Sequence, residues 1–128
     1  MLFTSRGLLR IKNARFRDDP APPEEGCDCP ACVHHSRAYL SHLIRAGELL
    51  GARLASLHNL RFYLRLLEEA VGGVRFRRIY TPAYEGGHQD HDATHLVALC
   101  FARQRDLLRR TWQVPFYHGH GRPWRLFR

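Results

Sequence analysis

The residues best suited to chemistry in this 128-residue sequence are three closely spaced cysteines, Cys27, Cys29 and Cys32. The spacing C-x-C-x2-C places three thiolates on one tight loop, close enough to share a single ion. Zinc prefers four nitrogen or sulfur ligands in a tetrahedron, with thiolates at ~2.3 Å and imidazole at ~2.0 Å. The pattern therefore predicts a metal site that needs one more ligand. Three free thiols in a surface loop would instead be an oxidation hazard.

Three histidines are candidates for the fourth ligand. His34 and His35 follow the cysteines directly, but they lie at the entry to a predicted helix and would strain so small a chelate ring. His58 lies on a second predicted helix and can return beside the cysteines if the two helices pack antiparallel. A complete Cys3His set leaves no open position, which predicts a structural zinc site rather than a catalytic one.

The elements that must position these ligands begin with two short strands. Leu2–Thr4 and Leu8–Lys12 flank a Ser-Arg-Gly turn, and the proline-rich acidic stretch 18–26 is a loop by composition. Ser36 can cap a helix over residues 36–50. The apolar face of that helix carries Leu40, Leu43 and Ile44.

A second helix is predicted over residues 52–70 and ends at Gly72-Gly73. Its predicted apolar stripe consists of Leu57, Leu60, Leu64 and Leu67. After this point we expect a strand over 74–82, a loop over 83–91, a third helix over 92–110 and a last strand over 112–118. Cys100 is expected on the apolar side of the third helix with Leu96, Val97 and Leu99, as a core residue rather than a ligand.

The first half of the chain resembles a known family through the stretches "KNARF", the C-x-C-x2-C knuckle, "SRAYL-HL-RAGE-LGARL" and "LHN". Residues 2–70 look like the C-terminal part of bacterial tRNA-guanine transglycosylases, also called queuine tRNA-ribosyltransferases. The resemblance implies that Cys27, Cys29, Cys32 and His58 bind a structural Zn²⁺. It also implies a fragment of a TIM barrel, with the zinc subdomain near the last barrel strand and taking part in a homodimer contact.

The resemblance implies tRNA as the partner, since these enzymes exchange the wobble guanine of certain tRNAs. The two catalytic aspartates of the family lie upstream of the matched segment, and a full barrel needs about 250 residues. Asp18 and Asp19 lie in the proline-rich loop and are poor replacements. We therefore expect no catalytic residue in this chain and no base exchange by the chain alone.

The second half carries a different resemblance. The stretch "RIYTPAYEGGHQDHDATHLVAL" resembles the second half of PIG-L-like (LmbE-like) zinc de-N-acetylases. By that match His91 would bind zinc and His88 would assist catalysis, with Asp90 between them and Gln89 in place of the usual proline. The "HPDDE"-like segment that supplies the other ligands has no counterpart here. The simpler interpretation is that Asp90 or Asp92 caps a helix and that the histidines face solvent.

The net charge of +8, carried by nineteen arginines and Lys12, fits a polyanionic partner such as RNA, or simply an arginine-rich surface. Aromatic residues also alternate with arginines near the C-terminus, where they could stack bases or cover the third helix. These residues are Trp112, Phe116, Tyr117 and Trp124, with Arg109, Arg110, Arg122 and Arg125. We expect the covering role, because aromatic residues in small domains usually serve the core.

Composition completes the prediction. The sequence has no run of 18 apolar residues and no signal peptide pattern, so we expect a cytoplasmic chain without a membrane partner. We expect an α+β fold: a zinc-stapled module over residues 1–72, then a strand-loop-helix segment over 73–128. Two half-motifs meeting near residues 72–78 suggest a truncated or mis-joined reading frame. Three functions stay open: a tRNA-guanine transglycosylase fragment, a de-N-acetylase fragment, or a zinc-stapled RNA-binding or dimerisation module.

Overall fold

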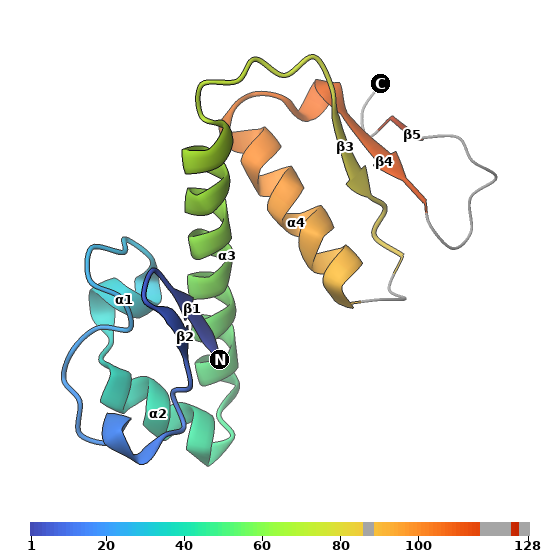
Figure 1. Cartoon of the computed structure of the whole chain (residues 1–128). Coiled ribbons are helices and arrows are strands. Elements are labelled where there is room, and N and C mark those ends of the chain that lie inside the picture. Colours follow the sequence, from blue (N-terminus) through green and yellow to red (C-terminus); the bar gives the residue numbers. More distant parts are fainter. Residues whose placement is uncertain (86–88, 116–123, 126–128) are drawn as a thin grey trace. The chain divides into compact units, whose positions relative to one another are not determined.

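The computed structural model describes residues 1–85, 89–115 and 124–125 of the chain (Figure 1). The backbone forms two compact units, Met1–Arg65 and Leu66–Arg128. Helices combine with short strands in a small chain, which confirms the α+β class. In the described ranges, no helix has both the length and the apolar character needed to cross a membrane.

The first unit opens with the predicted β-hairpin. β1 (Leu2–Thr4) pairs antiparallel with β2 (Gly7–Leu9). Gly7 has a φ of 103°, a backbone conformation that suits a residue without a Cβ. The hairpin is confirmed, although its second strand ends at Leu9 rather than at Lys12.

Two short helical turns then lead to the cysteines. The 3-10 turn η1 (Ala14–Phe16) precedes the proline-rich loop, and the helix α1 (Pro30–His34) follows it. Proline suits the first helical position, where the missing N–H has no partner to lose. Neither turn is predicted from the sequence, because each is too short to show an apolar repeat.

The two predicted helices of the first half exist, but the boundary between them is wrong: the first ends at Ala46 rather than at residue 50, and the second begins at Leu49 rather than at residue 52. In α2 (Arg37–Ala46), the hydroxyl of Ser36 accepts from the backbone N–H of Tyr39 at 3.1 Å. This helix ends at Gly47, whose φ of 74° is left-handed. The longer helix α3 (Leu49–Val71) ends just before Gly72.

The start of α3 approaches α2 closely. A Cβ added to the buried Gly51 would lie 2.9 Å from the Cβ of Leu43 and 3.1 Å from the backbone nitrogen of Ile44. Only a residue without a side chain therefore permits this approach.

The predicted leucine stripe of α3 is only partly right. Leu64 is buried, but Leu57 is 37% exposed. Gly51, Leu54 and His58 are the other buried residues of this helix. These three positions are spaced by three and four residues, so they share one helix face. The buried face is the one that carries the histidine.

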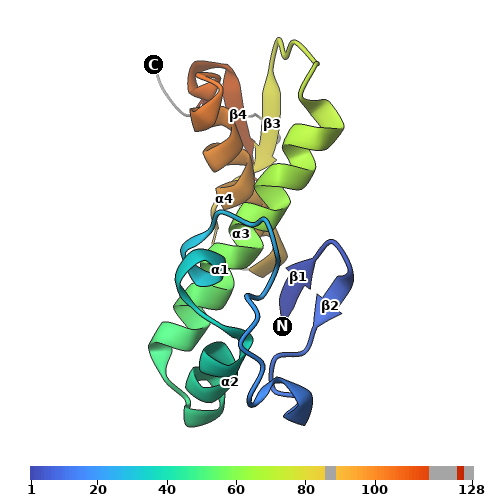
Figure 2. The same cartoon turned by 90° about the vertical axis from the view of Figure 1, so that its left-hand side faces the viewer.

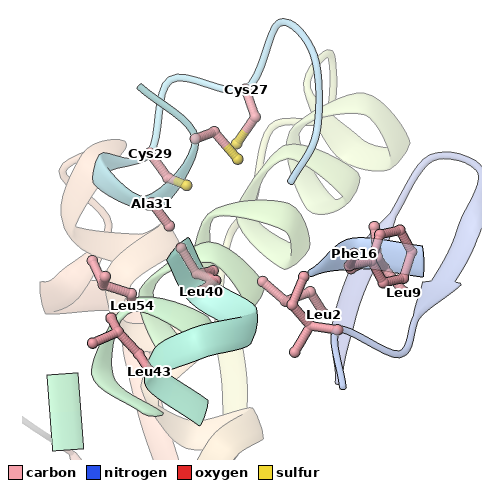
Figure 3. Close-up of a cluster of buried hydrophobic side chains, with 11 residues drawn as sticks. Leu2, Leu9, Phe16, Cys27, Cys29, Ala31, Leu40, Leu43 and Leu54 are labelled. Carbon is pink, nitrogen blue, oxygen red and sulfur yellow. The ribbon is translucent and has the colours of Figure 1, made fainter. Parts of the chain in front are cut away.

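The core of the first unit gathers side chains from every element around the cysteines. Figure 3 shows Ala31, Leu40, Leu43 and Leu54 grouped beside Cys29, while Leu2, Leu9 and Phe16 lie toward the hairpin. Ile11, Cys27 and Cys32 complete this cluster of buried side chains. The knuckle is therefore part of the hydrophobic core, not a loop on the surface.

The second unit is a small parallel βαβ arrangement. β3 (Ile79–Pro82) pairs parallel with β4 (Thr111–Val114), and the connection runs through α4 (Gln89–Gln104) and the 3-10 turn η2 (Leu108–Arg110). β5 (Trp124–Arg125) pairs antiparallel with β4. Figure 2 shows β3 and β4 side by side in this unit.

Several predicted boundaries of the second unit are wrong. The predicted loop over 83–91 ends early, because α4 already begins at Gln89. The predicted third helix is correspondingly too long, since α4 ends at Gln104 and η2 follows as a separate turn. The strand expected over 74–82 is limited to its last four residues.

The packing of α4 also differs from the prediction. Phe101 and Ala102 are buried, and the ring of Phe101 meets that of Phe76 edge-on at 5.9 Å between centroids. Leu96 is 52% exposed and Cys100 is half-buried. The expectation that Leu96 belongs to the apolar side is therefore wrong. His95 is buried and donates through Nδ1 to the carbonyl of Pro82 at 2.7 Å.

Candidate metal centre

Four side chains converge in the first unit: Cys27, Cys29, Cys32 and His58. All four are buried, and their potential ligand atoms lie within 4.8 Å of one another. Nδ1 of His58 lies 3.9, 3.5 and 3.2 Å from the sulfurs of Cys27, Cys29 and Cys32, in that order. A tetrahedral ion with the usual zinc bond lengths separates sulfur and nitrogen by ~3.5 Å. The donor set and its spacing fit a zinc ion.

The imidazole of His58 is held in the orientation that a ligand needs. Its Nε2 donates to the carbonyl of Phe3 on β1 at 2.7 Å. That bond fixes the proton on Nε2 and leaves Nδ1 as the unprotonated nitrogen that faces the sulfurs. The side chain is fully buried, so solvent does not compete for either nitrogen.

The knuckle is shaped by the first turn of α1. Cys29 stands at the N-cap of this helix, and its carbonyl accepts from the backbone N–H groups of Cys32 and Val33, both at 3.0 Å. Cys29 and Cys32 therefore lie on one turn. Gly26, with a φ of 74°, precedes Cys27 and turns the chain into the knuckle.

Burial sets the protonation of the thiols. It raises the pKa of the Cys29 thiol and, more strongly, that of Cys32. The backbone N–H of Glu24 acts in the opposite direction on Cys32, because it favours the thiolate. In the metal-free chain these two thiols are therefore neutral, and an incoming metal ion must displace their protons.

An ion pair ties the knuckle to α3. Nε and Nη2 of Arg61 donate to the two carboxylate oxygens of Asp28 at 2.5 and 2.9 Å. Asp28 lies between two of the cysteines, and Arg61 lies one turn after His58. The guanidinium, mainly through its hydrogen bonds, lowers the pKa of the Asp28 carboxyl. The pair bridges the two segments that supply the ligands.

A second residue of α3 holds the hairpin. The side-chain oxygen of Asn59 accepts from the backbone N–H of Phe3 at 2.9 Å, and its nitrogen donates to the carbonyl of Met1 at 3.2 Å. Neither Asn59 nor Arg61 is predicted as part of the site. The available signal is their position beside His58 on the helix that must face the cysteines.

The alternative ligands are not part of the cluster. The ring of His35 stacks on Tyr39 at 4.9 Å between centroids, and His34 meets His35 edge-on at 6.4 Å. Neither histidine belongs to the group of potential ligands found among the described residues. This geometry agrees with the prediction that His58, rather than His34 or His35, is the fourth ligand.

The histidine motif of the second unit is only partly described. His88 lies outside the described residues, and Asp90 and His91 lie in the first turn of α4. In the described part of the chain, neither Asp90 nor His91 belongs to a group of three potential metal ligands. Asp92 accepts from the backbone N–H of Glu85 at 3.3 Å, so this carboxylate helps to join the preceding loop to the start of α4.

The C-terminal aromatic residues are also partly outside the described structure. This applies to Phe116, Tyr117 and Arg122, and to the side chains of Trp124 and Arg125. Trp112 on β4 is half-buried, with the guanidinium of Arg78 5.9 Å from its ring centroid. Arg109 and Arg110 are exposed. The covering role of the C-terminal aromatic residues stays a prediction.

Comparison with known proteins assigns the first half of the chain. The family model for queuine tRNA-ribosyltransferase matches residues 1–75. Residues 76–128 lie beyond this match, and the resemblance of that part to de-N-acetylases gains no support from it.

Individual relatives agree with the family match. The queuine tRNA-ribosyltransferase of Thiobacillus denitrificans is 56% identical over 78 residues, which cover 61% of this chain and 21% of that protein. The enzyme of Nitrosomonas europaea is 61% identical over 66 residues, covering 52% of this chain and 18% of the relative. The chain thus spans about a fifth of the length of the curated relatives that it matches. It belongs to the queuine tRNA-ribosyltransferase family.

Proposed function

We propose that this chain carries the zinc module of a queuine tRNA-ribosyltransferase, in which Cys27, Cys29, Cys32 and His58 bind one structural Zn²⁺. The observation that carries the proposal is the buried convergence of these four side chains on one point. The group fits zinc through its donor types, its spacing and the hydrogen bond that orients His58. With four protein ligands the ion has no open position, so its role is to hold the knuckle on α3.

We propose that the module belongs to the exchange of the wobble guanine in tRNA, as a fragment of a TIM-barrel enzyme. The family match supports the reaction class, and the net charge of +8 suits a polyanionic partner. The 128 residues do not catalyse the exchange alone. Asp19 is engaged with the backbone N–H of Ala21 at 2.9 Å and with Arg37 at 3.1 Å, which suits a structural role.

The test is incorporation of labelled guanine into a tRNA with guanine at the wobble position. We expect background incorporation with this chain alone, because base exchange needs a nucleophile and an acid/base held rigidly at the ribose. Addition of a separately expressed barrel segment from a relative is expected to raise incorporation. Incorporation by the chain alone that disappears in Asp18→Ala or Asp19→Ala would contradict the proposal.

We further propose that the module pairs with a second copy of itself. The family resemblance supports this contact, and two large apolar side chains near the knuckle, Val33 and Tyr39, are 58% and 40% exposed. Sedimentation of the zinc-loaded chain is expected to show a concentration-dependent dimer that Tyr39→Ala weakens. A monomer at all concentrations would remove the dimer from the proposal and leave the zinc site untouched.

A further inference from the structure

The three cysteines of the metal centre are not held equally well by the backbone. Cys29 and Cys32 lie on the first turn of α1, whose backbone hydrogen bonds fix their spacing. Cys27 lies before that helix, on the loop that leads into it (Figure 3). Its sulfur is also the farthest of the three from Nδ1 of His58, at 3.9 Å. Cys27 is therefore the ligand that most needs support from outside its own segment.

The ion pair between Asp28 and Arg61 supplies support of this kind. Asp28 directly follows Cys27, and Arg61 lies on α3 three residues after His58, so the two α3 side chains are neighbours on the helix surface. Both hydrogen bonds of the guanidinium go to this one carboxylate, at 2.5 and 2.9 Å. Two parallel bonds fix the direction of a carboxylate as well as its distance. The pair therefore restrains the loop at Cys27 relative to the helix that carries His58.

The pair lies beside the metal centre without being part of it. In the described part of the chain, the group of potential metal ligands does not include Asp28. The side chains of Arg61 and Asp28 are 29% and 65% exposed, and an ion pair this open to solvent contributes little to global stability. Its effect falls on local opening instead. Without the restraint, Cys27 leaves the ion more often, and a competing ligand can take the open position.

We propose that the ion pair between Asp28 and Arg61 holds Cys27 against the metal ion and thereby slows the release of zinc. Asp28 and Arg61 are positioning residues, because they act through Cys27 rather than on the ion itself. This inference rests on the proposed zinc site, and it adds to that site the feature that controls exchange of the ion with other ligands.

The test is the rate at which the zinc-loaded chain transfers zinc to an excess of the chromophoric chelator pyridylazoresorcinol. Asp28→Asn removes the charge at nearly constant volume and is expected to speed release about threefold, in line with the modest strength of an exposed ion pair. Asp19→Asn is the matched control, because it removes the carboxylate of a second ion pair of the first unit, with Arg37 at 3.1 Å. This control is expected to change the rate less than about twofold. Equal acceleration in the two variants, or none in Asp28→Asn, would overturn the proposal.

Two further measurements show whether the pair acts as a unit and through its charges. Arg61→Gln is expected to match Asp28→Asn, and the double variant to release zinc no faster than either, because both changes remove the same interaction. Raising the salt from about 0.1 M to about 1 M is expected to speed release from the native chain about twofold and to leave Asp28→Asn unchanged, because salt screens an exposed pair. Accelerations that multiply in the double variant, or an equal salt effect in Asp28→Asn, would contradict the proposal.

The position of the opening is measured by alkylation of the zinc-loaded chain with iodoacetamide, followed by mass spectrometry. A cysteine that leaves the ion exposes a thiolate, which is the form that reacts. Asp28→Asn is expected to raise the modification rate of Cys27 about threefold, with a smaller change at Cys29 and Cys32. Equal increases at all three cysteines would indicate general unfolding and overturn the proposal.

The zinc content of the native chain separates this proposal from the proposed function. If the native chain holds one zinc and Asp28→Asn releases it at the native rate, the ion-pair proposal fails and the zinc site stands. If the native chain holds no zinc, the zinc site itself fails, and this proposal fails with it. One zinc in both chains, with faster release from Asp28→Asn than from Asp19→Asn, supports both.

Discussion

His58 joins two parts of the first unit at once. One ring nitrogen faces the three sulfurs, and the other donates to Phe3 on β1. The neighbouring Asn59 adds two hydrogen bonds to the same strand. A metal ion at His58 is therefore coupled to the N-terminal hairpin, because the bond that orients the ligand is also a bond that holds the strand.

The first prediction concerns Asn59. Asn59→Ala leaves the half-buried backbone N–H of Phe3 without its acceptor, which costs about 1 kcal/mol, the low end of the range for a donor left unpaired. We expect faster hydrogen exchange at the Phe3 amide and lower stability against denaturant, with zinc content unchanged. Asn13→Ala is the matched control, because its side chain makes no capping hydrogen bond at η1. Equal exchange rates at Phe3 in the two variants would show that Asn59 does not hold the strand.

At the scale of elements, the close approach of α2 and α3 sets the frame of the site. Gly51 permits this approach, and His58 follows seven residues later on the same face of α3. The distance between the helices therefore helps to determine whether His58 reaches the cysteines.

The second prediction is that Gly51→Ala destabilises the module. The new methyl group would meet Leu43 at 2.9 Å, and overpacking of this kind costs about 1–3 kcal/mol. The better helix propensity of alanine returns up to about 1 kcal/mol. We expect a net loss in denaturant unfolding and weaker zinc retention under chelation. Gly73→Ala, where no atom lies within 4 Å, is the control and is expected to be near neutral. A stabilised Gly51→Ala would contradict the packing.

The helices also show where sequence reasoning succeeds and fails. Ser36 marks the start of α2 by local chemistry, as predicted from the sequence. Gly47 ends the helix by an equally local signal, but the predicted helix over residues 36–50 runs past it, so that boundary is missed. The buried face of α3 cannot be read from the sequence in this way. Leucines occur around the whole helix, and the segments that pack against it decide which face is buried. Taking His58 as the reference position would have selected the correct face, with Leu54 and Gly51 on it.

At the scale of the whole chain, the two halves differ in how much the sequence determines. The zinc ligands are predictable because cysteine spacing and coordination geometry constrain them strongly. Glu24, Asn59 and Arg61 are not, because their partners are backbone groups or distant side chains that only the fold brings near. In the second half, β3 pairs parallel with β4, and this non-local contact cannot be predicted from the spacing of residues along the sequence.

The third prediction concerns the second unit. With Asp90 and His91 outside any group of three potential ligands in the described residues, this region is expected to retain no metal after mild chelation that spares the cysteine site. His91→Ala should therefore leave the metal content unchanged. We expect no deacetylation of N-acetylglucosamine-type substrates, and measurable activity that disappears in His91→Ala would reverse this view.

The central claim is that three cysteines and one histidine hold a single structural zinc ion. Its most direct test is the zinc content of the purified chain, measured by elemental analysis together with thermal unfolding. We predict one zinc per chain, lost in large part in Cys29→Ser with several kcal/mol of stability, because metal binding in such modules is largely folding free energy. Cys100→Ser removes a cysteine outside the cluster, so this variant should keep the zinc content and the thermal stability of the native chain. Full zinc occupancy in a chain lacking Cys27, Cys29 and Cys32 would contradict the claim.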